Sequence, residues 1–562
     1  MKLIIREYLS LLKESNELDR VLPDLLLMMG IEPISHAQVG VRQYGVDVAA
    51  VGEYNDEGKV LMLFTIKQGD LGRSDWDVNE QSIRQSLDEI KDVYLDSHIR
   101  PEHLSLKKKI ILCTGGNLKQ EIQQNWKGYI SKNTKVGEVE YEFWGGDKLS
   151  IFIEEFMFNE QIVPIEFRSS FRKVLSLLSD PDYDLSDYYN VLNSLLLESE
   201  FGSLSKQNNL KKAIKALRSI HLVLNILFFW AKNEENIKPA IYASERTMLV
   251  TWEFLRKNDL FNKRSILSVS YEIYKTLFRI YSEYFNKLQQ YCHIQNGLNG
   301  YSRHSILENH NIFEQLGIIC TSGVLYIFHA GIEQDEKLLE SARAITDTVK
   351  SLIENHSSTC SPYYDNHIIE ISEAIFLLSC FSEKEFIDNW IKKILNHIAF
   401  AYNHMERYFP IQSDSFDDLV ALAISGTKRK EELMEISTLL PTIAQWCAVL
   451  ELRDSYSLVR DVVKNVFQNT TLQIWYPDSE TDQFIYICNA AFKSGIVDAP
   501  MSIPETIEDM KTMIEKVKEK IVNFEGFSSV KNGFAILPII SSRHFKTPFL
   551  PCFWQQKIIN KS

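Results

Sequence analysis

The segment GVDVAAVGEYNDEGKVLMLFTIKQGD, residues 45–70, has the pattern of a β-hairpin. Two runs of alternating and β-branched residues, 46–54 and 60–68, flank the sequence Asn-Asp-Glu-Gly, which favours a turn. Such a hairpin joins two antiparallel strands. We therefore expect residues 45–70 to form the centre of a β-sheet.

The turn determines which side chains of this hairpin lie together. A turn centred on Glu57 pairs Asp47 directly with Lys67. Because side chains alternate along a strand, Asp47, Thr65 and Lys67 then share one face. The other face is apolar and suited to burial: Val46, Val48, Ala50, Met62, Phe64 and Ile66. The acid and the lysine form either a cross-strand ion pair, worth under about 1 kcal/mol when exposed, or part of a polar site.

The composition is that of a folded chain with more than one domain. The chain has 562 residues, of which 45% are hydrophobic and 24% charged, so two to four domains are expected. The net charge of −14 argues against a surface that coats nucleic acid non-specifically, but it leaves room for a local basic cleft. The eight cysteines include no Cys-x-x-Cys pair, which disfavours a zinc knuckle or a disulfide framework.

The apolar segments do not predict a membrane protein. The most apolar window, residues 220–231, is about twelve residues long, whereas a membrane span needs about twenty, so we expect a buried helix there. The apolar run at the start of the chain is too soon interrupted by charge for a signal peptide. Together with the cysteine pattern, this predicts a cytoplasmic location.

The segments around the hairpin extend an α/β pattern to about residue 164. Four further segments have secondary-structure signals: a helix over 18–29 ending at Gly30, a helix over 75–97, a buried strand over 108–116, and a strand, turn and helix over 139–149. Residues 1–164 therefore predict an α/β domain with a mixed sheet.

The pattern changes after residue 164. Three-to-four spacing dominates, strand signals thin out, and no repeat of fixed period is evident. Residues 165–562 therefore predict a large all-α region of one or two subdomains. Within it, 505–522 predicts an amphipathic helix, and 524–551 predicts loops with at most one strand.

The N-terminal segments resemble the PD-(D/E)xK nucleases, and among them the restriction-endonuclease-like domains of the Mrr kind. Members of that family have a helix with an acid, a strand with Gly-hydrophobic-Asp, a strand ending in (Glu/Gln)-x-Lys, a helix and further strands. This chain has ELDRVLPDLLLMMG, YGVDVAAV, FTIKQ, the helix over 75–97, KKIILCTGG and EFWGGDKL in that order, within residues 1–164. The resemblance implies a Mg²⁺- or Mn²⁺-dependent endonuclease.

The resemblance also assigns roles to residues. Asp47 would be the metal-binding aspartate and Lys67 the catalytic lysine. Phosphodiester hydrolysis uses a divalent metal to polarise the phosphate and activate water, and Mg²⁺ prefers oxygen ligands. The Ile66 carbonyl and the Thr65 hydroxyl are candidates for neutral oxygens. Thr65 stands where the family has Glu or Gln, so a catalytically degenerate domain that only binds nucleic acid or protein is the alternative.

Two further sets of residues follow from the resemblance. The helix acid is either Asp19, at about the family's usual distance before Gly30, or Glu17, which has the more usual residue type. The cations Arg73, Arg84 and Lys108 are candidates for contacts with nucleic-acid phosphates. The simpler interpretation of Lys108 and its lysine neighbours is a solvated run of charge.

The layout of the whole chain suggests a wider role. A nuclease joined to a large helical module resembles the effectors of bacterial antiviral defence, in which the module senses a trigger, assembles, or contacts a partner. The expected partners are nucleic acid, which this resemblance suggests is DNA, and a second copy of the chain or an accessory defence protein. This part of the prediction rests on layout and on no particular residue.

Overall fold

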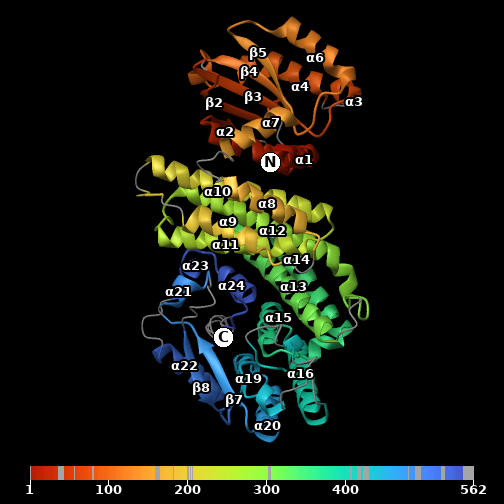
Figure 1. Ribbon diagram of the computed structural model, residues 1–562, viewed down its shortest axis with the longest axis vertical. Coiled ribbons are helices and arrows are strands. Elements are labelled where there is room, and N and C mark those ends of the chain that lie inside the picture. The colour runs from red at the N-terminus through yellow and green to blue at the C-terminus, as the bar shows by residue number, and fades with distance from the viewer. Residues whose placement is uncertain are drawn as a thin grey trace. The chain divides into compact units, whose positions relative to one another are not determined.

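The computed structural model describes most of the chain as two compact units, Met1–Ala243 and Ser244–Ser562 (Figure 1). The ranges it describes are 2–35, 44–55, 57–78, 82–157, 165–180, 183–198, 201–202, 204, 207–300, 305–405, 408–413, 419–421, 430–478, 480–487, 495–520 and 526–548. The domain boundary predicted near residue 164 falls at 158–164, outside the described residues.

The first unit contains a five-stranded mixed sheet, as predicted. Its strands lie in the order β1-β2-β3-β4-β5, and their bounds are Glu32–Ser35, Val48–Glu53, Lys59–Lys67, Lys107–Thr114 and Val139–Trp144. The pairs β1–β2 and β2–β3 are antiparallel, and the pairs β3–β4 and β4–β5 are parallel. Parallel strands are normally covered on both faces. In agreement, every residue from Val60 to Ile66 is buried.

Helices lie on both sides of this sheet (Figure 1). One set consists of α3 (Arg73–Asp77), α4 (Ile83–Glu89) and α6 (Gln120–Asn133), which share a hydrophobic core with β3 and β4. The other set consists of α1 (Lys2–Leu11), α2 (Asp19–Met29) and α7 (Gly146–Phe152). On that side the rings of Phe64, Trp144 and Phe152 stack edge to face. The expectation of a single apolar face on the hairpin is therefore wrong, because both faces of β3 are buried.

The short elements refine the predicted boundaries. The helix predicted over 18–29 is α2, and Gly30 ends it with a left-handed φ of 84°. A π-helical turn, η1 (Glu14–Leu18), precedes α2 directly. The single helix predicted over 75–97 is divided into α3, α4, a π-helical turn η2 (Ile90–Tyr94) and α5 (Leu95–Ser97). A 3₁₀ turn, η3 (Pro101–His103), leads into β4, and a π-helical turn, η4 (Ile153–Met157), follows α7.

Three longer helices complete the first unit. They are α8 (Ile165–Leu177), α9 (Ser186–Leu192), which continues as the π-helical turn η5 (Asn193–Leu197), and α10 (Gln207–Asn233). Helix α10 contacts the α/β part through Arg218, whose guanidinium lies 3.1 Å from the carboxylate of Asp24, and through Ser219, whose hydroxyl donates to the Met157 carbonyl. These helices therefore belong to the same compact unit as the sheet.

The second unit is mainly helical, as predicted. Its described helices are α11 (Lys238–Lys257, which crosses the division between the units), α12 (Arg264–Cys292), α13 (Ser305–Glu333), α14 (Glu336–Asn355), η6 (Ser357–Cys360), η7 (Asp365–His367), α15 (Ile368–Cys380), α16 (Lys384–His404), α18 (Lys430–Leu433), α19 (Leu439–Val449), α20 (Arg453–Asn465), α21 (Thr481–Phe484), α22 (Ile507–Lys520), α23 (Ser528–Lys531) and α24 (Leu537–Phe545).

The predictions for residues 165–562 are wrong in two details. A small sheet of β6 (Ile436–Ser437), β7 (Thr471–Tyr476) and β8 (Ile496–Met501) interrupts it. The exposure of β8 along its length does not alternate, so a period-two signal is missing there. The predicted loops after residue 524 include α24, whose described residues from Leu537 to Arg543 are all buried. A helix buried all round has no amphipathic period to detect.

Two helices, α10 and α13, are long and apolar enough to cross a membrane by length and composition. In each of them, 61% of the apolar window is buried inside the structure. The window over 220–231 lies in α10, where most of its apolar side chains are buried, as expected for a core helix. The cytoplasmic location stays a prediction.

Candidate active site

Asp47 lies immediately before β2, at the end of the β2–β3 ladder. The predicted register would place Val48 opposite Ile66, but the ladder pairs Val48 with Phe64. The register prediction is therefore wrong by two residues, and Asp47 is not directly opposite Lys67. The physical reason is a tighter turn, which is closed by Glu57 N–H donating to Tyr54 O at 3.1 Å.

Two backbone contacts fix the Asp47 carboxylate at this position. The Asp47 N–H donates to Phe64 O at 2.8 Å, and the Ile66 N–H donates to Asp47 Oδ2 at 2.7 Å. The amide of Ile66, and not its carbonyl, is thus the group seen in contact with Asp47. Together the two bonds hold Asp47 against the C-terminal end of β3, where Lys67 is the last residue of the strand.

Lys67 forms an ion pair with an acid that the sequence analysis missed. Its Nζ lies 3.6 Å from Glu14 Oε1, and its side chain is 12% exposed. Lys67 and Glu14 both lie within electrostatic reach of Asp47. The site therefore includes an acid from the turn η1 in addition to the residues of the hairpin.

The two acids proposed for the N-terminal helix have different positions. Asp19, the first residue of α2, lies within electrostatic reach of Asp47, and its Oδ1 is buried with no hydrogen-bond partner among the described residues. Glu17 Oε2 accepts a hydrogen bond from the Lys13 N–H at 2.8 Å. Of the two alternatives, Asp19 is the one that adds its charge to that of Asp47 and Glu14.

The local helix geometry explains why Glu14 and Asp19 act together. The Asp19 N–H donates to Glu14 O across the π-helical turn, which is an i to i+5 bond. In a regular α-helix of 3.6 residues per turn, two residues five apart point in clearly different directions. The wider turn brings positions 14 and 19 closer to alignment along the helix, and both side chains reach the region of Asp47.

The environment of Asp47 raises the pKa of its carboxyl to about 6. Burial is the largest cause, and the negative charges of Glu14 and Asp19 add to it. The Ile66 N–H and the Lys67 ammonium oppose the shift. Three acids, Asp47, Glu14 and Asp19, thus lie near a single lysine, Lys67. A bound cation would reduce the electrostatic repulsion between them.

Thr65 occupies the position of the missing acid of the resembled family. Its side chain is buried, with 1% exposure, and its hydroxyl has no hydrogen-bond partner among the described residues. A buried hydroxyl without a partner costs free energy, so this oxygen is available to a ligand or a water molecule.

The three cations proposed to contact phosphates do not gather at this site. Arg84 is paired with Asp77 at 3.3 Å and with Asp88 at 4.0 Å. The Nζ of Lys108 contacts the carbonyl of Leu104. Arg73 is exposed at the start of α3. No contact within the described residues joins any of them to Asp47 or Lys67.

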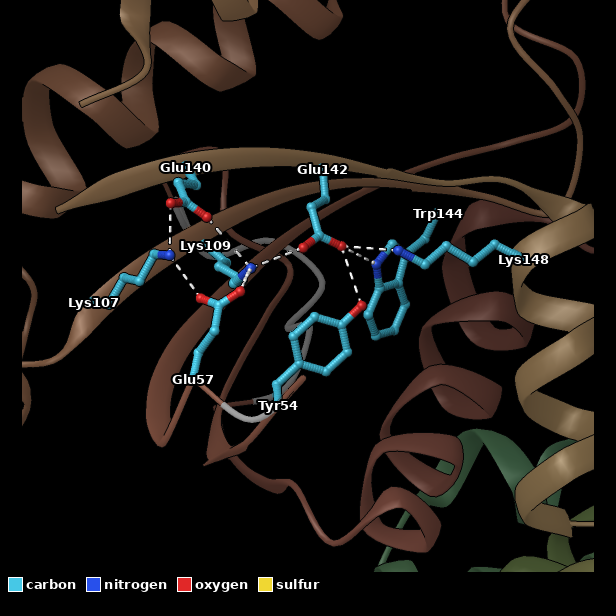
Figure 2. A network of polar contacts seen from close by, with 8 residues as sticks. All are labelled: Tyr54, Glu57, Lys107, Lys109, Glu140, Glu142, Trp144 and Lys148. Carbon is cyan, nitrogen blue, oxygen red and sulfur yellow. Dashed lines mark hydrogen bonds and ion pairs between the residues drawn. The ribbon is translucent and has the colours of Figure 1, made fainter. Parts of the chain in front are cut away.

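The lysine run at the start of β4 is not simply a solvated row of charge (Figure 2). The side chain of Lys109 is only 3% exposed and lies 3.0 Å from Glu57, 3.0 Å from Glu142 and 3.4 Å from Glu140. Lys107 lies 2.6 Å from both Glu57 and Glu140. Glu142 also accepts hydrogen bonds from three more side chains: Tyr54, Trp144 and Lys148. This network is satisfied internally and ties the turn of the hairpin to β4 and β5.

The donor set at Asp47 suits a hard cation, although it is not a complete metal site by itself. Among the described residues, no three His, Cys, Asp or Glu side chains form a group that could hold a metal ion. Mg²⁺ often takes only one or two carboxylates and completes its shell with water and phosphate. The raised pKa of Asp47 and the partnerless oxygens of Asp19 and Thr65 are compatible with such a partial site.

Comparison with known proteins adds nothing to this geometry. No family model, no curated protein and no solved structure matches the chain. Any functional conclusion therefore rests on the arrangement of the residues themselves.

Proposed function

We propose that the first unit is a metal-dependent nuclease that resembles the PD-(D/E)xK enzymes. The observation that carries the proposal is the meeting of Asp47, Lys67 and Glu14 at the end of the central strands, with Asp19 beside them. The mixed sheet supports it, because an antiparallel hairpin followed by a helical crossover into parallel strands is the order expected from the resemblance.

The residues divide the chemistry between them. Asp47 would hold Mg²⁺ or Mn²⁺, with one of the two neighbouring acids, Asp19 or Glu14, as a second carboxylate and with water and phosphate completing the shell. When bound, such an ion polarises the phosphate and lowers the pKa of a coordinated water molecule. The Ile66 N–H keeps the Asp47 carboxylate in a fixed orientation. The Lys67 ammonium is the nearby positive charge that would hold the nucleophile and stabilise charge that develops on it.

Glu14 gives this site an acid that the motif alone lacks. Thr65 cannot supply a second carboxylate, and Glu14 reaches the same lysine from a different element. This favours an active site over a degenerate one. The alternative, a domain that only binds nucleic acid or protein, is favoured by the buried neutral side chain of Thr65 at a position where the resembled family has Glu or Gln.

The role of the helical unit belongs to the same proposal. We infer by analogy of layout that it senses a trigger or contacts a second copy or an accessory protein, and that the whole chain is an effector of bacterial antiviral defence. An acidic chain with a small site is expected to bind nucleic acid weakly unless a partner or an assembly holds it there.

Cleavage and metal binding together test the proposed nuclease. Plasmid and oligonucleotide DNA are incubated with the full chain in Mg²⁺ or Mn²⁺, and Mn²⁺ binding is titrated calorimetrically. Asp47→Ala and Lys67→Ala should each abolish cleavage, and Asp47→Ala should also abolish Mn²⁺ binding. Glu138→Ala and Lys132→Ala, which change exposed residues of the same unit, are the matched controls.

The outcomes separate the two candidate functions. Robust cleavage by the Asp47→Ala variant would contradict the proposed nuclease site. Mn²⁺ binding that depends on Asp47 supports the site even when the parent needs an activator before it cuts. Nucleic-acid binding without cleavage and without Asp47-dependent Mn²⁺ binding supports the degenerate module.

A further inference from the structure

Three aromatic rings meet on the surface where the chain enters β2. The rings of Tyr44 and His98 have centroids 4.4 Å apart, and His98 stacks on Tyr94 at 5.8 Å with an angle of 22° between the rings. His98 is exposed, and Tyr44 and Tyr94 are half-buried. We call these three residues the aromatic step. Tyr94 packs against the hydrophobic core of the sheet and supports the exposed ring of His98, so the step presents π-surface to solvent mainly through His98.

The aromatic step lies beside the candidate active site. Tyr44 precedes Asp47 by three residues, so their Cα atoms are at most about 11 Å apart. Stacked nucleotides of one strand are spaced by about 3.4 Å, so this distance corresponds to about three nucleotides. A nucleic-acid strand with a phosphate at Asp47 would therefore have its neighbouring bases within reach of the step.

The backbone holds the step in place. Gly45 has a left-handed φ of 80°, and a Cβ at this position would lie 2.2 Å from the Ser86 carbonyl oxygen of α4. The chain between Tyr44 and Asp47 is thus pressed against the helix layer that also leads to Tyr94 and His98. This close approach positions the backbone between Tyr44 and Asp47 against α4.

A cation accompanies the rings. The Arg100 side chain is 63% exposed and only loosely paired, with Nη1 3.9 Å from Glu102. Burial raises the pKa of Tyr94, and the positive charge of Arg100 opposes that shift, which puts Arg100 within electrostatic reach of the tyrosine. Aromatic rings beside an arginine are the usual elements of surfaces that bind single-stranded nucleic acid.

We infer that the aromatic step stacks an unpaired base within about three nucleotides of the phosphate to be cut, so that the substrate is a single strand, a flap or a frayed end of nucleic acid. In an intact duplex the bases are stacked on one another and do not present their faces to a protein. This inference rests on the proposed nuclease and adds its substrate class.

Binding is measured on the full chain carrying Asp47→Asn, which separates affinity from cleavage. The probes are a fluorescein-labelled DNA single strand, the matched duplex, and a single strand with 2-aminopurine, whose fluorescence falls when it stacks. His98→Ala and Tyr44→Leu remove rings, and His98→Phe and Tyr44→Phe keep them. His293→Ala and Tyr291→Leu, at exposed positions of the second unit, are the matched controls.

The expected result is tighter binding of the single strand than of the duplex, with quenching of 2-aminopurine. Each ring removal should weaken single-strand binding by about 5- to 100-fold, since one base stacked on an aromatic ring contributes to affinity on this scale. The phenylalanine variants should bind like their background, because a ring remains. A purely structural role would change thermal stability and leave the quenching unaltered.

Two outcomes overturn the inference in distinguishable ways. In the first outcome, the parent cuts DNA, but either the ring variants bind and quench 2-aminopurine as their background does or the duplex binds as tightly as the single strand. The inference about the substrate then fails, while the proposed nuclease function stands. When neither strand form binds and the parent neither cuts DNA nor binds Mn²⁺, the proposed function fails and the inference with it.

Discussion

Substituting Asp47 by asparagine should stabilise the first unit while abolishing its activity. The pKa of Asp47 is about 6 in the folded protein against an ordinary value of 3.8. The folded state therefore binds this proton more tightly than the unfolded state. Above pH 6 the folded protein carries a charged Asp47 carboxylate in an unfavourable environment, which lowers the free energy of unfolding. This loss of stability disappears as the pH falls to about 4, where the carboxyl is protonated in the folded state.

The magnitude follows from the two pKa values. A difference of about two pH units corresponds to about 3 kcal/mol at 1.36 kcal/mol per unit. Asparagine has the same shape and its oxygen keeps the bond from the Ile66 N–H, but its NH₂ group needs a new partner. We therefore expect a gain of about 1 to 3 kcal/mol at pH 7.5. For a unit of this size, that is a rise in melting temperature of about 2 to 10 °C.

Calorimetry of the full chain without metal is the assay, because units that melt separately give separate transitions. Parent and Asp47→Asn are compared from pH 4 to pH 8, with Glu138→Gln as an exposed control. The stabilisation should be largest at pH 7 to 8 and should vanish near pH 4. Lower stability of Asp47→Asn at pH 7.5, or a gain that does not change with pH, would refute the reasoning.

The other predictions concern the remaining acids and the buried lysine. Glu14→Gln should weaken Mn²⁺ binding by about 10- to 100-fold in calorimetric titration, and an unchanged affinity would remove Glu14 from the site. Thr65→Glu should raise cleavage in the parent and restore it in Glu14→Gln; no effect in either background would contradict this compensation. Mn²⁺ affinity should fall below pH 6, because the metal then competes with a proton on Asp47, and a flat titration from pH 5 to 7.5 would count against it. Lys109→Met should lower the free energy of unfolding by about 1 to 3 kcal/mol, because it removes a buried ammonium that bonds to the partly exposed carboxylates of Glu57 and Glu142; a loss below 1 kcal/mol in denaturant melts would show that the network is dispensable.

The sequence predicts the order of strands well because the local signals agree with one another. The hairpin has alternating residues and a turn sequence, and the strand ending at Thr114 contains the apolar run Ile110–Cys113. The register of the hairpin is harder to predict than the order of the strands, because it depends on where the turn closes. A slip of two residues leaves every side chain on the same face of the sheet, so the pattern of polar and apolar residues does not distinguish the predicted register from the observed one.

Glu14 illustrates a more general limit of reading a site from sequence. Three acids, Glu14, Glu17 and Asp19, lie within six residues, and the family resemblance offers only the last two as the helix acid. The π-helical turn changes the geometry, because it brings position 14 towards position 19 and leaves Glu17 bonded to the Lys13 N–H. Propensity and spacing do not predict such a turn, since its extra residue is accommodated by packing against β3. The site therefore depends on a backbone irregularity: an insertion or deletion of one residue in η1 would keep every acid in the sequence and still separate Glu14 from Lys67.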